Sequence, residues 1–217
     1  MLFTVEGNIG AGKSTLLTRL MKEQLFSRKH IVAFEPIDEW MNVTPGGNQS
    51  LFEMYYQDKA KHGFMFQMFA LQTRMEHIDN IFRSDPDKII ICERTHLTDC
   101  EIFAKMLYNN KLMTDAEYYV YRKWYDFCVS RFIKQVDGII YLQASPSTCM
   151  ERIQKRNRTG EENISIDYIT DLHECHESWI LKNTGTPACI INGEVGEEEL
   201  DIDAIVTFVH TLAAYMS

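Results

Sequence analysis

The chain has 217 residues, and its apolar share of 45% and charged share of 24% are typical of a globular protein with a sizeable core. A net charge of −9 argues against nucleic acid as the main partner, and no apolar run approaches the roughly 18 residues that suggest a membrane span. The six cysteines are scattered without a C-x-x-C pair, which favours reduced thiols and a cytoplasmic protein. We expect one domain over residues 1–217.

Five short apolar segments alternate with helical patterns along the chain. The predicted strands cover residues 2–6, 30–35, 88–92, 138–142 and 188–192. The predicted helices cover residues 13–26, 49–57, 64–83, 96–108, 114–135, 147–157, 166–182 and 198–215, and residues 36–47 form the longest predicted loop. This alternation predicts an α/β fold with a five-stranded parallel sheet between two layers of helices. Ligands bind at the carboxyl ends of such strands, so the residues that follow each strand are the candidates for a site.

A glycine-rich loop follows the first predicted strand. Residues 7–14 have the G-x-x-x-x-G-K-S pattern of a phosphate-binding loop, in which backbone N–H groups and a helix N-terminus attract phosphate oxygens. Lys13 can reach the β- and γ-phosphates of a nucleoside triphosphate, and the Ser14 hydroxyl can bind Mg²⁺. The predicted ATP contacts from this loop are Gly7, Asn8, Ile9, Gly10, Ala11, Gly12, Lys13, Ser14 and Thr15.

Charged residues follow the second and third predicted strands. Pro36 fixes the turn after Glu35, which places this carboxylate at the rim of the site, where it can accept a proton from an attacking hydroxyl. After the third strand, Glu93 can hold Mg²⁺ through water, and Arg94 can neutralise charge or orient the acceptor oxygen. The alternatives are a surface glutamate in a turn at Glu35 and a buried structural ion pair at Glu93 and Arg94.

Three arginines follow the fourth predicted strand. Arg152 and Arg156 share one helix face, and Arg158 begins the loop beyond that helix. Such close like charges become favourable when guanidinium groups grip a polyphosphate between them, and a solvated basic face is the alternative. Gly160 and the acidic residues that follow it favour a mobile lid over residues 152–163.

In their order and spacing, these features resemble the deoxyribonucleoside kinase family, and above all its deoxycytidine and deoxyguanosine kinases. The resemblance also rests on Trp40, Phe66, Gln67 and residues 172–179, and it covers nearly the whole chain. It implies a P-loop kinase fold and Mg²⁺-dependent transfer of the ATP γ-phosphoryl group to the 5′-hydroxyl of a deoxynucleoside, in nucleotide salvage. It also implies a homodimer.

Carried over position by position, the resemblance implies catalytic roles for Glu35, Arg94 and Lys13. Ser14 and Glu93 would hold the magnesium ion, partly through water. The lid residues implied for the triphosphate are Arg152, Arg156 and Arg158.

The resemblance also implies which residues bind the nucleoside. Tyr56 and Glu161 would bind the sugar 3′-hydroxyl, with Glu162 as the alternative one position further on. Gln67 would contact the base edge, because its amide offers a donor and an acceptor side by side. The residues implied for the nucleoside are Glu35, Trp40, Tyr56, Phe66, Gln67, Arg74, Arg94, Asp99, Phe103 and Glu161.

Base preference would depend on Arg74 and Asp99. In the resemblance, deoxycytidine and deoxyguanosine kinases carry Arg and Asp at these positions, whereas thymidine-preferring members carry smaller or apolar residues. A buried carboxylate held by an arginine can accept a hydrogen bond from an exocyclic amino group, which thymine lacks. We therefore expect deoxycytidine or purine deoxynucleosides to be favoured over thymidine.

Two other functions are weighed against this one. A thymidylate-like monophosphate kinase needs a cation to meet the acceptor phosphate, but the residue before Glu35 is Phe34. A nucleotide-dependent switch of the GTPase type would show N-K-x-D and D-x-x-G segments, and neither is present.

Residues 173–177 include metal-capable side chains without H-E-x-x-H spacing, so we expect a helix that lines the core or a dimer interface there. The residues that depart from animal members, which would suit a viral or bacterial origin, are His96, Cys100 and Glu101.

Overall fold

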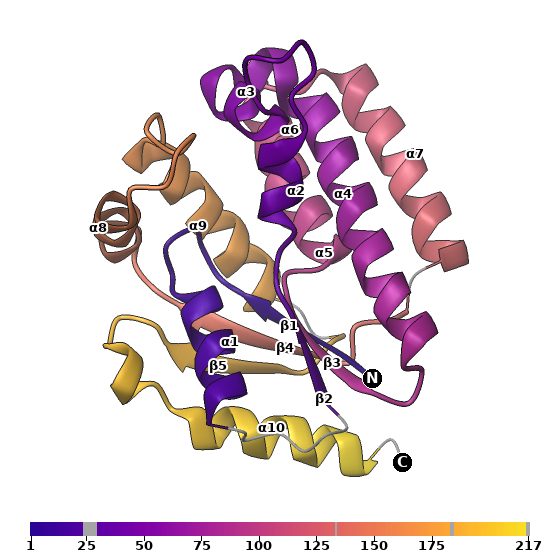
Figure 1. Cartoon of the computed structure of the whole chain (residues 1–217), viewed down its shortest axis with the longest axis vertical. Coiled ribbons are helices and arrows are strands. Elements are labelled where there is room, and N and C mark those ends of the chain that lie inside the picture. The colour runs from indigo at the N-terminus through magenta and orange to yellow at the C-terminus, as the bar shows by residue number, and fades with distance from the viewer. Residues whose placement is uncertain (24–29, 133, 183–184, 216–217) are drawn as a thin grey trace.

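The computed structural model describes residues 1–23, 30–132, 134–182 and 185–215 (Figure 1). Its centre is a sheet with the strand order β2-β3-β1-β4-β5, in which every neighbouring pair is parallel. The predicted α/β class and five-stranded parallel sheet are confirmed, and each strand begins and ends within two residues of its predicted bounds. The strands are β1 (Leu2–Glu6), β2 (His30–Ala33), β3 (Ile89–Glu93), β4 (Gly138–Gln143) and β5 (Ala188–Asn192).

Helices cover both faces of this sheet (Figure 1). α10 (Ile202–Tyr215) runs along one face, whereas α4 (Lys59–Ser84) and α7 (Asp115–Phe132) stand over the other. None of the helices in the described ranges combines the length and the apolar character needed to cross a lipid bilayer. The remaining elements are α1 (Lys13–Lys22), α2 (Ile37–Asn42), α3 (Leu51–Gln57), α5 (His96–Thr98), the π-helical segment η1 (Asp99–Ala104), α6 (Lys105–Asn109), α8 (Pro146–Arg156), α9 (Ile166–Ile180) and the 3₁₀ turn η2 (Glu197–Glu199).

The central strand β1 sets the position of the site. All five of its residues are buried, as expected for a parallel strand covered on both faces. The register aligns Val5 with Glu93 of β3 and Glu6 with Tyr141 of β4. The glycine-rich loop that leaves β1 therefore starts beside Glu93, the last residue of β3.

Side-chain caps fix where several helices begin. The Ser50 hydroxyl accepts a hydrogen bond from the Glu53 N–H, and the Glu53 carboxylate accepts one from the Ser50 N–H, which is a capping box at the start of α3. The Asp58 carboxylate caps α4 with one hydrogen bond from the Lys61 N–H, and α4 begins five residues before its predicted start. α8 begins with a proline after the cap residue Ser145, where the missing N–H costs nothing.

One predicted loop is wrong in part, because residues 36–47 contain the helix α2. The acidic residues Asp38 and Glu39 lie in its first turn, where they interact favourably with the helix dipole, and Trp40 is buried against the core. Six residues carry too little periodicity to be recognised as a helix from sequence alone. The tertiary contact of one tryptophan therefore decides the conformation here.

The other differences concern the form and ends of helices. The predicted helix 96–108 is present but is divided into α5, η1 and α6, with the π-helical turn in the middle. The predicted helix 198–215 begins as the 3₁₀ turn η2, and α10 starts only at residue 202. Of the predicted helices 13–26 and 114–135, residues 24–26 and 133 lie outside the described residues.

Candidate active site

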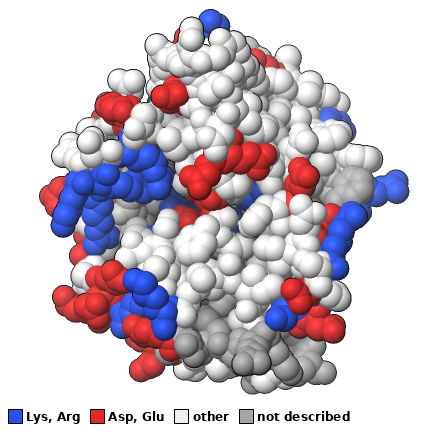
Figure 2. Space-filling view, viewed as in Figure 1, with Lys and Arg blue, Asp and Glu red and all other residues white. Residues whose placement is uncertain are grey.

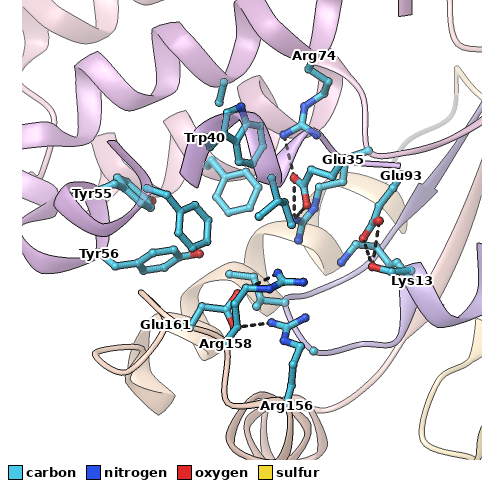
Figure 3. Close-up of a pocket in the computed structure, with 18 of the residues that line it drawn as sticks. Lys13, Glu35, Trp40, Tyr55, Tyr56, Arg74, Glu93, Arg156, Arg158 and Glu161 are labelled. Carbon is cyan, nitrogen blue, oxygen red and sulfur yellow. Dashed lines mark hydrogen bonds and ion pairs between the residues drawn. The ribbon is translucent and has the colours of Figure 1, made fainter. Parts of the chain in front are cut away.

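The carboxyl ends of β1, β2 and β3 open into a cavity of about 420 Å³ (Figure 3). Gly7, Asn8 and Ala11 belong to the glycine-rich loop but do not line this cavity. The predicted site residues that do line it are Ile9, Gly10, Gly12, Lys13, Ser14, Thr15, Glu35, Trp40, Tyr56, Phe66, Gln67, Arg74, Glu93, Arg94, Asp99, Phe103, Arg152, Arg156, Arg158 and Glu161.

Five further residues line the cavity that the sequence reasoning missed: Ile37, Phe52, Tyr55, Ala70 and Lys155. Phe52 stands four positions before Tyr56 on the same face of α3, and this helical spacing is the signal that could have indicated it. Tyr55 is adjacent to Tyr56, so helical spacing from Tyr56 does not indicate it. The position of Ile37 depends on α2, which the sequence did not reveal.

The glycine-rich loop is held in shape by its own backbone and by Asn8. Gly10 has a φ of +80°, and a Cβ atom there would lie 2.4 Å from the Cys149 carbonyl oxygen, so only glycine fits. The Asn8 side chain accepts a hydrogen bond from the Ile9 N–H and donates one of 2.8 Å to the Ile169 carbonyl. Asn8 thus ties the loop to α9 rather than facing the cavity.

Two oxygen-bearing side chains meet beside Lys13. The Ser14 hydroxyl lies 2.9 and 3.0 Å from the two carboxylate oxygens of Glu93, and both residues line the cavity (Figure 3). Lys13 Nζ donates a hydrogen bond of 2.9 Å to the Asn8 carbonyl. Hard oxygen donors of this kind suit a divalent cation such as Mg²⁺ better than a soft metal.

Glu35 lies at the centre of a buried network of charges. Arg94 Nη1 donates to both of its carboxylate oxygens at 3.1 Å, and Arg74 Nη2 donates to one of them at 3.0 Å. Arg74 also grips Asp99 with two hydrogen bonds, of 2.9 and 3.0 Å. The predicted Arg74–Asp99 pair therefore exists, and the same arginine also contacts Glu35, which the sequence did not indicate.

The backbone of Arg94 is strained. Its φ is +61°, a left-handed conformation that costs a non-glycine residue about 1–2 kcal/mol. Its guanidinium group donates to the Gly7 carbonyl at 3.2 Å and lies 4.9 Å from the centre of the Phe103 ring. Arg94 thus links Glu35 to the start of the glycine-rich loop.

The network shifts the ionisation of two groups. Burial alone would raise the pKa of Glu35, but the Arg94 and Arg74 guanidinium groups outweigh it and hold this pKa at about 2. Burial, followed by repulsion from Arg94, lowers the pKa of Lys13 from its usual 10.5 to about 8. Glu35 is therefore ionised at neutral pH, whereas Lys13 loses its charge under mildly alkaline conditions.

If Lys13 contacts the phosphates of ATP, as the sequence predicts, ATP binding should weaken as the pH rises through about 8, because a neutral amine no longer attracts phosphate. The measurement is kcat/KM for ATP across the neutral and alkaline range, since this ratio reports ionisations of the unliganded enzyme. The Lys13→Arg variant keeps its charge throughout this range, so its profile should lack the decline. The same decline in both proteins would assign it to another group.

Aromatic side chains form the wall of the cavity away from the glycine-rich loop. The Tyr55 and Phe66 rings stack with their centroids 4.6 Å apart, and Trp40 meets Phe66 edge-on at 5.5 Å. Gln67 and Arg74 also line the cavity, and Gln67 Oε1 and Arg74 Nη1 are buried without a hydrogen-bond partner among the described residues. Both residues therefore keep an unused hydrogen-bonding atom that a polar ligand could engage.

Basic residues of the predicted lid also line the cavity. Figure 2 shows basic side chains gathered over α8 and the loop beyond it, beside a hollow in this face of the molecule. Arg156 and Arg158 form ion pairs with Glu161, which is buried and lines the cavity. Glu162 is exposed and accepts a hydrogen bond from the Gly160 N–H instead.

Arg152 is placed differently from its two neighbours. Its guanidinium group donates to the carbonyl oxygens of Ala11, Gly193 and Val195 at 3.1, 2.8 and 3.0 Å. It thus joins the glycine-rich loop to the turn after β5, while it also lines the cavity.

The segment 173–177 is part of α9, and its residue His176 packs into the core, whereas Glu174 is exposed. His176 is fully buried, its Nδ1 lies 2.6 Å from the Leu172 carbonyl oxygen, and its ring stacks on Tyr141. Burial lowers the pKa of His176 to about 3, so the ring is neutral. Over the described ranges, no group of three or more His, Cys, Asp or Glu side chains is arranged to hold a metal ion.

A family model and several known proteins match most of this chain. The family model for deoxynucleoside kinases matches residues 3–213. The mitochondrial deoxyguanosine kinase of Xenopus laevis is 33% identical over 197 residues, which cover 83% of this chain and 73% of that protein. The deoxycytidine kinase of Homo sapiens is 33% identical over 201 residues, or 83% of this chain and 75% of that protein. A probable deoxycytidine kinase of fowlpox virus is 33% identical over 196 residues, or 88% of this chain and 78% of that protein. The chain therefore belongs to the deoxynucleoside kinase family.

Proposed function

We propose that this kinase phosphorylates deoxycytidine and purine deoxynucleosides in preference to thymidine, with Mg-ATP as the donor. The observation that carries the preference is the buried pair of Arg74 and Asp99, which is joined by two hydrogen bonds and lines the cavity. A carboxylate held in this way can accept a hydrogen bond from the exocyclic amino group of a base, which thymine lacks.

A substrate panel tests this proposal. We expect kcat/KM for deoxycytidine or a purine deoxynucleoside to exceed that for thymidine by about tenfold or more, because thymine leaves buried polar groups unpaired. The corresponding 5′-monophosphates serve as the control, and we expect no transfer to them. Thymidine as the best substrate would contradict the base preference, and rapid turnover of a monophosphate would instead support the thymidylate-like function.

In the proposed reaction, Glu35 accepts a hydrogen bond from the 5′-hydroxyl and receives its proton as phosphoryl transfer proceeds. A carboxylate with a pKa of about 2 is a weak base, so the proton moves late, after much of the bond to the leaving group has broken. Arg94 donates hydrogen bonds to both oxygens of Glu35. It thereby fixes the orientation of the carboxylate that receives the 5′-hydroxyl. Lys13 interacts with the β- and γ-phosphates.

Ser14 and Glu93 are the residues that would hold Mg²⁺, since their oxygens lie together next to Lys13. When bound, the ion would neutralise charge on the phosphates.

The three arginines of the proposed lid, residues 152–163, fall into two groups. Arg156 and Arg158 would bind phosphate oxygens directly, and Arg152 would chiefly keep the glycine-rich loop and the turn after β5 together.

The nucleoside would lie along the aromatic wall. Phe66 and Phe103 would enclose the base, and Trp40 would complete the same pocket. Tyr56 and Glu161 would bind the sugar 3′-hydroxyl, because both line the cavity between the aromatic wall and the lid (Figure 3). The two arginines that contact Glu35 are neutralised by Glu35 and Asp99, which suits an uncharged acceptor.

We further propose a single working domain that forms a homodimer through the outer face of α7. Tyr119, Val120, Trp124 and Phe127 are 43–63% exposed and follow a helical spacing, so they form one apolar stripe. The Trp124 and Phe127 rings stack on each other within this stripe.

All six cysteines are free thiols, which supports the reducing cytoplasm as the place of action.

We expect Trp124→Glu to convert the dimer into a monomer, because a charge in the centre of an apolar interface cannot be paired. Light scattering coupled to gel filtration gives the mass directly. Tyr215→Glu on α10 is the matched control, since Tyr215 is 85% exposed on a different face. A Trp124→Glu protein of unchanged mass, or a wild-type protein with the mass of one chain, would contradict this interface.

A further inference from the structure

The lid contains two ion pairs that occupy both oxygens of one buried carboxylate. Arg156 Nη2 lies 2.6 Å from Glu161 Oε2, and Arg158 Nη1 lies 3.3 Å from Glu161 Oε1 (Figure 3). The Glu161 side chain is 3% exposed, whereas the side chains of Arg156 and Arg158 are 33% and 28% exposed. The carboxylate is therefore fixed in the cavity wall, and the arginines are the members that can turn to another partner.

In the proposed function, each of these three side chains has a second binding partner that competes with the ion pairs. The phosphates of ATP attract the arginines, while the sugar hydroxyl needs the carboxylate. When an arginine moves to a phosphate, the buried carboxylate loses compensating charge and must find another donor. Donors that the carboxylate could then use include the hydroxyl of Tyr56, which lines the same cavity, and the 3′-hydroxyl of the proposed substrate.

Resting on the proposed function, we infer that the ion pairs of Glu161 couple the two substrate sites. ATP draws Arg156 and Arg158 away from Glu161, and the carboxylate then binds a sugar 3′-hydroxyl more strongly. The effect is reciprocal, so a nucleoside with a 3′-hydroxyl tightens ATP binding by the same factor. Arg156 and Arg158 thereby help to select the sugar as well as to bind phosphate.

The first test uses the unmodified protein and two nucleosides. Calorimetry gives the Kd of the best deoxynucleoside of the panel and of its 2′,3′-dideoxy counterpart, with and without a non-hydrolysable Mg-ATP analogue. We expect the analogue to lower the Kd of the deoxynucleoside by about fivefold or more and the Kd of the dideoxynucleoside by less than about twofold. Equal tightening of both nucleosides would overturn the inference.

The second test compares two neighbouring variants. In Glu161→Gln the amide still accepts a hydrogen bond from the sugar but no longer holds the arginines by charge. We expect this variant to bind the analogue alone more tightly than the wild type and to lose the coupling. Glu162→Gln is the matched control and should keep the coupling, because Glu162 is exposed and bonds the Gly160 N–H.

The outcomes separate this inference from the proposed function. A protein that phosphorylates no deoxynucleoside contradicts the function itself. A protein that phosphorylates deoxynucleosides normally, but in which Glu161→Gln keeps the full coupling, contradicts only the inference.

Discussion

Replacing Glu35 with glutamine is expected to lower kcat by about 10²–10⁴-fold, while the affinity for the nucleoside changes much less. The amide can still accept a hydrogen bond from the 5′-hydroxyl, but it cannot take up the proton. It also leaves Arg94 and Arg74 without the negative charge that they share, so some loss of stability accompanies the kinetic effect.

Steady-state kinetics and calorimetric binding of the nucleoside separate the two effects. Asp38→Asn is a suitable control, because Asp38 is an exposed carboxylate three positions further along the chain. The role of Glu35 would be disproved by a kcat close to that of the control. A proportionate loss of binding and turnover would make Glu35 a binding residue instead.

Joint replacement of Arg74 by Met and Asp99 by Ala is expected to reduce the preference for amino-bearing bases over thymidine by about tenfold or more. The substitution removes both members of the buried pair and makes room for the thymine methyl group. Because Arg74 also holds Glu35, we expect kcat to fall with every nucleoside. The informative quantity is thus the ratio of kcat/KM values and not activity with a single substrate.

The single variant Asp99→Ala provides the comparison. It leaves the Arg74 guanidinium buried without its bidentate partner, so we expect a loss of about 3 kcal/mol or more in the free energy of unfolding, measured with urea. The double variant should unfold less easily than this single one, because no buried charge loses its main partner there. An unchanged ratio of kcat/KM values in the double variant would show that the base is selected elsewhere in the cavity.

Much of the fold could be predicted because it depends on local patterns. Short apolar runs between helical segments specify a parallel sheet, and the loop at residues 7–14 must connect a strand to a helix. The helix α2 and the π-helical form of η1 could not be predicted, since packing around Trp40 and around the cavity decides them. Short segments carry too little pattern to compete with such contacts.

The site, like the fold, could be predicted from the sequence only in part. Motifs and resemblance pointed to the residues that line the cavity, because strand ends meet at one edge of a parallel sheet. The contacts between those residues were not predictable. Three side chains each have a second partner that spacing does not reveal: Arg74 with Glu35, Arg152 with main-chain carbonyls, and Glu161 with Arg156.

The π-helical segment η1 affects how the range of nucleosides could be altered by engineering. Its wider turn leaves Asp99 and Phe103 in the cavity lining, while the Cys100 thiol on the same turn contacts the Arg122 guanidinium group. Loss of one residue would restore ordinary helical winding and rotate Asp99 relative to Phe103. Grafts from other kinases should therefore exchange residues 95–109 as one block, with the length of the block preserved.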